Sequence, residues 1–317
     1  MNVAIVGGGG TIGSTVAYDL LTGPNAVDVT VIDTDEGAAY GHATDLRHAT
    51  RHVSHPTGRA SRSTYGTVET ATPGPDGLAD ADCIVVTASA PRTSGGAERG
   101  GRMTFLERNI EIAEEIGSWL REVEPGALLC VTNPVDRITH RLYAESGWPR
   151  EHVLGYSLSE TARMAHWIAD HEGVSPSAVS CPMLGEHGES LVPVFSRATV
   201  AGRPLSLTED EREAALDFVR DAPYDVIAHR GPEDSSRWVT GRGVAGIVEA
   251  LSSDDVDEPV CLSVPLEGEY GAEGVCLSVP VTLSSNGWSE IHEWELSAWE
   301  RERMAAAAGA VRSSLER

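Results

Sequence analysis

The sequence predicts an α/β fold in which a doubly wound parallel sheet is followed by a second, α+β domain. Short apolar runs alternate with helix-compatible segments in the first half of the 317-residue chain. A glycine-rich turn stands between the first apolar run and the first helical segment. Near residue 150 the spacing of the runs changes, so we predict one domain over residues 1–150 and a second over residues 151–317.

The first half is expected to alternate strands and helices along the chain. Parallel strands need crossover helices, and ligands bind at the carboxyl ends of such strands. The predicted strands are Val3–Val6, Val27–Ile32, Thr67–Glu69, Cys83–Thr87 and Leu128–Thr132. The predicted helices are Thr11–Leu21, Gly37–His48, Thr104–Val123 and Pro134–Ser146.

The glycine-rich turn has the G-x-G-x-x-G spacing of a dinucleotide-binding Rossmann unit. Its glycines allow a tight turn and a close approach to a pyrophosphate, which the N–H groups of a helix N-terminus then bind. The next apolar run ends in Asp33, whose carboxylate would accept hydrogen bonds from a ribose and repel a 2′-phosphate. We therefore predict NAD as the cofactor, bound by Gly8, Gly10, Thr11, Ile12, Gly13 and Asp33.

The second half is expected to mix helices and antiparallel strands. A helix is predicted over Ser159–His171, and another, Trp294–Leu315, closes the chain. The string Cys-Leu-Ser-Val-Pro occurs twice, which predicts adjacent antiparallel strands at Leu262–Leu266 and Gly274–Val281. In the first half, residues 91–101 form a long glycine-rich segment after a strand and are expected to act as a mobile lid.

The charge of the chain is strongly negative. It has 48 acidic residues against 24 basic ones, a formal net charge of −24, and every basic residue is arginine. This balance favours a halophilic protein, because concentrated salt mutes self-repulsion. A GC-rich genome would explain the missing lysines but not the acidic excess. Such a charge argues against nucleic-acid or anionic-membrane partners, and the first residues do not resemble a secretory signal, so a cytoplasmic location is expected.

The sequence predicts no metal site. Five scattered cysteines lack C-x-x-C spacing and are expected to be buried free thiols in a reducing compartment. His48, His52 and His55 are not framed by an acid or a cysteine at ligand spacing.

Several short strings combine groups suited to binding and reducing a small anion. Arginine clamps carboxylates, and a histidine between glycines can act as an acid or a base near neutral pH. Taken in order, the strings resemble the lactate/malate dehydrogenase family over nearly the whole chain. The strings that carry the resemblance are Asp45-Leu46 with His48-Ala49, Asn133-Pro134-Val135-Asp136 and Gly185-Glu186-His187-Gly188.

The resemblance implies a role for each candidate site residue. His187 would exchange the proton of the substrate hydroxyl, Arg163 would bind the C1 carboxylate, and Asn133 would orient substrate and nicotinamide. Arg102 would polarise the C2 oxygen, and Asn109, seven residues on, would contact the cofactor. The residue after the loop proline, glutamine in lactate enzymes and arginine in malate enzymes, is Arg92 here, which favours malate/oxaloacetate. A homodimer or homotetramer is expected.

Three departures from the family pattern leave alternatives open. Glu160 stands where aspartate normally pairs with the catalytic histidine, and Glu189 replaces a second aspartate. The lid is four residues longer than usual, so Arg99 competes with Arg102 for its role. A dehydrogenase for another 2-hydroxy acid, lactate-like or bulkier, and a poorly active NAD-binding paralogue are the alternative functions.

Overall fold

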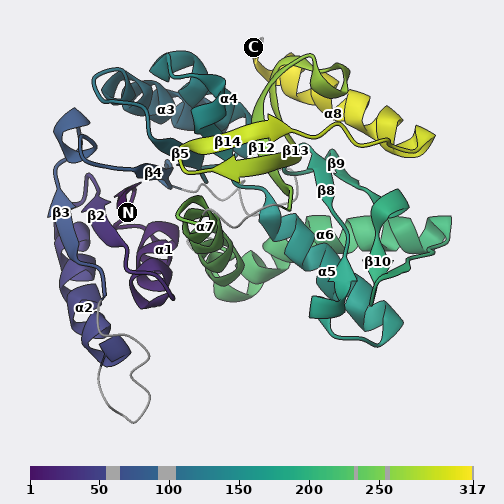
Figure 1. Cartoon of the computed structure of the whole chain (residues 1–317), viewed down its shortest axis with the longest axis horizontal. Helices are drawn as coiled ribbons and strands as arrows, with labels where there is room; N and C mark the ends of the chain where they lie inside the picture. The colour runs from purple at the N-terminus through teal and green to yellow at the C-terminus, as the bar shows by residue number, and fades with distance from the viewer. Residues whose placement is uncertain (55–64, 92–104, 232–234, 254–257, 316–317) are drawn as a thin grey trace.

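The computed structural model describes residues 1–54, 65–91, 105–231, 235–253 and 258–315. Within these residues, the first half of the chain forms six parallel strands (Figure 1). They are β1 (Asn2–Val6), β2 (Asp28–Ile32), β3 (Val68–Ala71), β4 (Cys83–Val86), β5 (Ala127–Cys130) and β6 (Val153–Gly155). Their order, β3-β2-β1-β4-β5-β6, reverses direction between β1 and β4, where a doubly wound sheet binds its ligands. The predicted fold class is confirmed.

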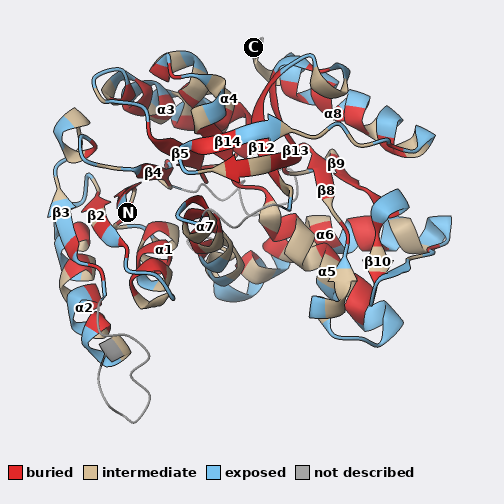
Figure 2. Cartoon of the chain, in the orientation of Figure 1, coloured by how far each residue is buried: buried red, intermediate tan, exposed pale blue. Residues whose placement is uncertain are grey.

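Helices cover both faces of this parallel sheet. Val3 and Ile5 of β1 belong to one apolar core and Ala4 and Val6 to another, because successive side chains of a strand point to opposite faces. The sheet is accordingly buried between the helical layers (Figure 2). The first core is covered by α1 (Thr11–Thr22) and α2 (Glu36–Ser54), and the second by α3 (Leu106–Leu120) and α4 (Val135–Ser146).

The predicted strands of the first half are all present, with ends that differ by two residues or fewer. Two predicted helix ends are wrong: α2 continues past His48 to Ser54, and α3 ends at Leu120, three residues before Val123. The next glycine or proline after His48 is Pro56, so the sequence offers no helix breaker at the predicted end of α2.

The second half extends the same sheet with antiparallel strands. The two copies of the repeated string lie in β12 (Val260–Glu267) and β13 (Glu273–Ser284), which pair antiparallel as predicted. β12 joins the parallel half through β6. Beyond β13 follow β8 (Met183–Gly185) and β9 (Leu191–Pro193), with β14 (Gly287–Ile291) also beside β13. A small separate sheet contains β7 (Val179–Ser180), β10 (Thr199–Val200) and β11 (Arg203–Pro204).

The helices of the second half include two that the sequence analysis missed. The predicted α5 (Leu158–Glu172) is present, whereas α6 (Glu209–Arg230) and α7 (Arg237–Leu251) were not expected. α6 begins at a capping box in which Thr208 and Glu211 each accept from the other's backbone N–H. Pro223 inside α6 weakens its helical signal in the sequence. α7 packs against α1, so a helix from the second half of the chain contacts the first half.

The closing helix α8 (Ala298–Leu315) begins later than predicted. The hydroxyl of Ser297 accepts from the N–H of Glu300, and the Glu300 carboxylate accepts from the N–H of Ser297. This reciprocal cap starts the helix after Ser297 and leaves Trp294 outside it.

The five cysteines are buried and unbridged, as predicted. Burial raises the pKa of Cys83 to about 12, so its thiol is inert near neutral pH. Among the described residues, no helix combines the length and the apolar character that a membrane span requires. The predicted lid, residues 91–101, lies outside the described residues except for Pro91. The domain division at residue 150 stays a prediction.

Candidate active site

The glycine-rich turn after β1 is shaped by close backbone contacts. Gly7 has φ +85°, and a Cβ there would lie 2.4 Å from the backbone nitrogen of Ala88. A Cβ on Gly13 would lie 2.5 Å from the carbonyl oxygen of Gly7, and one on Gly8 would lie 2.8 Å from a Val31 methyl. Real Cβ atoms do not approach other heavy atoms this closely, so the backbone contacts of Gly7 and Gly13 require glycine where the turn meets the end of β4 and the start of α1.

A cavity of about 450 Å³ opens beside this turn at the carboxyl ends of β1 and β4. Four predicted cofactor residues line it: Gly10, Thr11, Ile12 and Asp33. Gly8 and Gly13 do not line the cavity and instead pack behind it. Gly10 precedes α1 without any side-chain cap, so the first-turn N–H groups are left for an anion.

Asp33 is held in place for contact with a ribose. Its carboxylate accepts from the N–H groups of Gly9 at 2.9 Å and Asp35 at 3.0 Å. Among the described residues that line this cavity, none is a lysine or an arginine that could bind a 2′-phosphate. The site residues therefore fit a dinucleotide of the NAD type.

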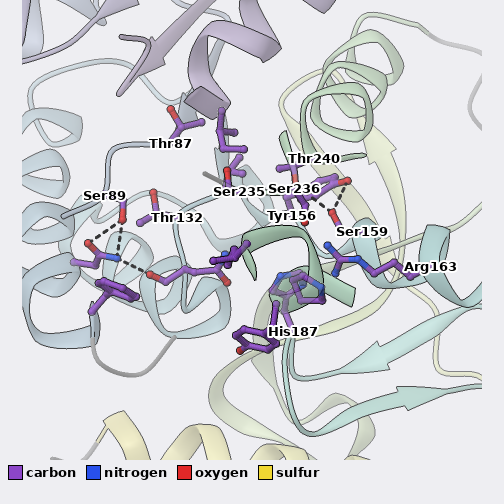
Figure 3. Close-up of a pocket in the computed structure, with 18 residues that line it drawn as sticks. Thr87, Ser89, Thr132, Tyr156, Ser159, Arg163, His187, Ser235, Ser236 and Thr240 are labelled. Carbon is purple, nitrogen blue, oxygen red and sulfur yellow. Dashed lines mark hydrogen bonds between the residues drawn. The ribbon is translucent and has the colours of Figure 1, made fainter. Parts of the chain in front are cut away.

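A second cavity, of about 140 Å³, adjoins the first. The two share Ile12, Thr87, Ser89 and Ser235. Asn133, Arg163 and His187, predicted from three separate segments, all line the second cavity (Figure 3). A ligand that crosses from the glycine turn would therefore place its far end among an amide, a guanidinium and an imidazole.

Glu160 lies directly behind His187. It is in the first turn of α5 and is 3% exposed, and its Oε2 lies 2.5 Å from Nδ1 of His187. Its Oε1 lies 3.8 Å from Nη1 of Arg163. The extra methylene of glutamate is thus accommodated in the folded protein. The predicted pairing of Glu160 with His187 has the geometry to support an imidazolium.

The loop that carries His187 joins β8 to β9. Gly185, at the end of β8, has φ +83°, and a Cβ there would lie 2.7 Å from a Val192 methyl. Glu189, the second departure from the family pattern, has an exposed side chain and does not line the cavity, while its carbonyl oxygen accepts from Arg220 of α6.

Two buried carboxylates outside the predicted site also hold this loop. Asp136 accepts from the backbone N–H of His187 at 2.7 Å and from the hydroxyl of Ser263 at 2.7 Å. Burial, reinforced by nearby Glu186, raises the pKa of Asp136 to about 6. Glu186 forms a buried ion pair with Arg137 at 2.6 Å. Asp136 and Glu186 belong to two of the strings that carry the family resemblance, and the sequence analysis assigned neither of them a role.

Asn109 lines the second cavity and connects two segments of its wall. Its Oδ1 accepts from the N–H of Ala90 at 2.8 Å, and its Nδ2 donates to the carbonyl of Asn133 at 2.6 Å and to Ser89 Oγ at 3.2 Å. Asn109 thereby connects the segment after β4 to the segment after β5. The cofactor contact predicted for Asn109 stays a prediction.

One wall of the second cavity comes from elements that the sequence analysis missed. It is made by Pro223, Tyr224 and Ile227 of α6 and by Ser235, Ser236 and Thr240 in and before α7. Ser159 lies within hydrogen-bond reach of both Tyr156 and Thr240 (Figure 3). The capping box of α6 was the available signal for this wall.

Three predicted site residues, Arg92, Arg99 and Arg102, lie outside the described residues. Pro91, just before them, lines the cofactor cavity. His55, one of the three histidines weighed as metal ligands, is also outside the described part. Within that part, no group of three His, Cys, Asp or Glu side chains is arranged to hold a metal ion.

Comparison with known proteins shows which family the chain matches. The family model of the lactate/malate dehydrogenase NAD binding domain matches residues 1–155, and that of the lactate/malate dehydrogenase alpha/beta C-terminal domain matches residues 160–317. A malate dehydrogenase from Haloarcula marismortui is 33% identical, covering 96% of this chain and 95% of the relative. An L-lactate dehydrogenase from Salinibacter ruber is 34% identical, covering 98% and 96%.

Among solved structures, the malate dehydrogenase from Aeropyrum pernix matches with a TM-score of 0.85 and 27% identity, covering 99% of this chain and 97% of that one. The two family models together span nearly the whole chain, and the break between them runs from the end of β6 into the first turn of α5. The chain belongs to the lactate/malate dehydrogenase family.

Proposed function

We propose that this protein is an NAD-dependent malate dehydrogenase, which interconverts malate and oxaloacetate. The observation that carries the proposal is the meeting of His187, Arg163 and Asn133 in one cavity that continues into the cofactor cavity. Relatives named for malate and for lactate both resemble the chain at similar identity. The choice between these substrates therefore depends on the site residues and on experiment.

The residues of the second cavity are positioned to bind a carboxylate and to accept a proton. NAD supplies the hydride acceptor when bound. Arg163 pairs with the C1 carboxylate of the substrate, and Asn133 donates to its C2 oxygen. With Nδ1 of His187 against Glu160, the Nε2 atom takes the hydroxyl proton. The buried Glu160 carboxylate stabilises the imidazolium that results.

Two arginines outside the described residues complete the proposal. Arg92 binds the second carboxylate that distinguishes malate from lactate, and Arg102 polarises the C2 oxygen, with Arg99 as the alternative for that role. A homodimer or homotetramer, a cytoplasmic location and a division into domains at residue 150 remain part of the proposal.

A steady-state screen tests the proposed function. Oxaloacetate, pyruvate and bulkier 2-oxo acids are compared with NADH and with NADPH in molar KCl. We expect oxaloacetate with NADH to have the highest kcat/KM, and Arg92→Gln to shift preference from oxaloacetate toward pyruvate. His187→Asn should lower kcat by roughly 10²–10⁴-fold.

Four outcomes would contradict the proposal. Full oxaloacetate reduction by His187→Asn would exclude the acid–base role. An unchanged preference in Arg92→Gln would exclude the specificity role. NADH binding by fluorescence without any oxaloacetate-dependent oxidation would instead favour a poorly active paralogue, and a higher kcat/KM for another 2-oxo acid would favour a sibling dehydrogenase.

A further inference from the structure

We propose that Asp136 is the positioning residue for His187, holding the backbone of the histidine loop so that the imidazole faces Arg163 and Asn133. This inference rests on the proposed function, in which His187 exchanges the substrate proton. Asp136 does not line the cavity, so its action reaches the substrate only through His187.

The contacts of Asp136 are direct and fully buried. Its side chain is 0% exposed, and its Oδ2 accepts from the N–H of His187 at 2.7 Å. The other oxygen, Oδ1, accepts from Ser263 Oγ at 2.7 Å. Ser263 is in β12 and is itself 0% exposed, so the carboxylate is fixed from two sides. A carboxylate held by two hydrogen bonds can locate a backbone amide within a narrow range.

A second interaction joins the first turn of α4 to the histidine loop at Glu186, the residue before His187. Arg137 Nη1 lies 2.6 Å from Oε1 of Glu186, and Oε2 of Glu186 accepts from the N–H of Ser190. Arg137 Nε donates to the hydroxyl of Ser314 near the end of α8, at 2.6 Å. The histidine loop is therefore held to α4 at two consecutive residues, and α4 is held to α8.

The first turn of α4 thus lies next to Asn133 in the chain and also holds the loop of His187. Asn133, which lines the cavity, stands three residues before Asp136 on the chain, immediately ahead of α4. Asn133 is joined to α4 through Pro134 alone, so the segment that positions Asn133 leads directly into the helical turn that holds His187. This arrangement fixes the proton acceptor relative to the group that binds the C2 oxygen. A misplacement of 1 Å costs about 100-fold in rate.

Two substitutions of Asp136 separate positioning from folding. Asp136→Ala removes both hydrogen bonds and should lower kcat by about 100-fold. The KM for NADH should stay within about twofold, because Asp136 is absent from the cofactor cavity. Asp136→Asn keeps an oxygen for the N–H of His187 and turns its amide toward Ser263, so kcat should recover to within about fivefold of the parent.

Ser263→Ala provides a second test if Asp136→Ala does not fold. It keeps the carboxylate but frees one of its oxygens, and kcat should fall by about fivefold with an unchanged KM for NADH. Glu300→Ala is the matched control, because Glu300 is another buried carboxylate that accepts from backbone N–H groups and a serine hydroxyl. It does not line either cavity, so its loss should lower the melting temperature and leave kcat unchanged.

The inference is overturned if folded Asp136→Ala keeps a kcat within threefold of the parent, or if Asp136→Asn loses as much kcat as Asp136→Ala. It is also overturned if Glu300→Ala reproduces the full loss, because any buried carboxylate would then suffice. His187→Asn distinguishes this result from the proposed function. An active His187→Asn excludes the proposed function, whereas an inactive His187→Asn beside a fully active Asp136→Ala excludes the positioning role alone.

Discussion

The glycine turn and the histidine loop are two functional regions built by different means. The turn is a run of consecutive residues after β1, and Asp33, the acid that accepts from the N–H of Gly9, lies only 24 residues from it in the chain. The histidine loop is held by bonds that span 51 residues to Asp136 and 49 residues to Arg137. The acid that holds it is in turn fixed by Ser263, 127 residues distant.

Because of this difference, different kinds of substitution should disrupt the two regions. The turn depends on the absence of side chains where two backbone segments approach, so added atoms disturb it. The histidine loop depends on buried charged groups, so removal of one partner leaves the other uncompensated in a low-dielectric interior. Four predictions test this contrast.

The largest effect is expected at Glu160. Glu160→Gln keeps the shape of the side chain but removes the charge beside His187, so kcat should fall by roughly 10²–10⁴-fold. Glu160→Asp shortens the reach across the 2.5 Å contact and should lower kcat by about tenfold. Steady-state kinetics and NADH titration check both variants. A parent-like kcat for Glu160→Gln would show that the charge is not needed, and NADH affinity should not change in either variant.

The next effect is a pH-dependent stability difference at Asp136. Burial raises its pKa from 3.8 to about 6, so the folded protein binds this proton more tightly than the unfolded chain does. As pH rises from about 4 to about 6, the unfolded chain loses the proton first and the folded state is destabilised. Asp136→Asn lacks this titration. The free energy of unfolding of the variant minus that of the parent should therefore rise by about 3 kcal/mol from pH 4 to pH 7.

Urea unfolding at several pH values measures this difference. Gly10→Ala provides the control, because a change at the glycine turn should leave the pH profile parallel to that of the parent. A difference between Asp136→Asn and the parent that does not vary with pH would show that Asp136 titrates normally in the folded state.

Two glycines of the turn should respond differently to alanine. Among the described residues, a Cβ on Gly10 would meet only the Gly7 carbonyl, at 3.3 Å, and Gly10 lines the cofactor cavity. Gly10→Ala should therefore raise the Kd for NADH about tenfold while the free energy of unfolding changes by less than about 0.5 kcal/mol. A Cβ on Gly13 would lie 2.5 Å from that carbonyl, so Gly13→Ala should lower stability by about 1–3 kcal/mol. Equal stability losses in the two variants would contradict the distinction.

Salt should have the smallest effect on catalysis, because it acts on the surface and not on either site. With a net charge of −24, the protein should gain roughly 5–10 °C in Tm when KCl is raised to molar concentration, because screening weakens self-repulsion. The ratio of the kcat of Glu160→Gln to that of the parent should stay constant, because buried charges are screened much less. A flat Tm across the KCl series would refute the proposed halophilic adaptation.

The features predicted from sequence are those with a local signal. The strands β1 to β5, the glycine turn and the antiparallel pair β12–β13 each occupy one short stretch with a recognisable pattern, whereas β6 has only three residues and was not predicted. The errors also have local causes: α2 continues because no breaker follows His48, and α8 begins late because Ser297 caps it. α6 was missed because Pro223 interrupts its pattern, and with it the wall of the second cavity was missed.

The sequence by itself determined the fold class, the family resemblance and the identity of the groups that can do the chemistry. The glycine spacing and Asp33 predict the cofactor because backbone shape and one nearby acid are local properties. Only the tertiary structure decided that Asp136 and Arg137 hold the loop of His187, and that α6 and α7 close the cavity. These contacts join segments far apart in the chain, and no spacing along the sequence records which distant segments the sheet will bring together.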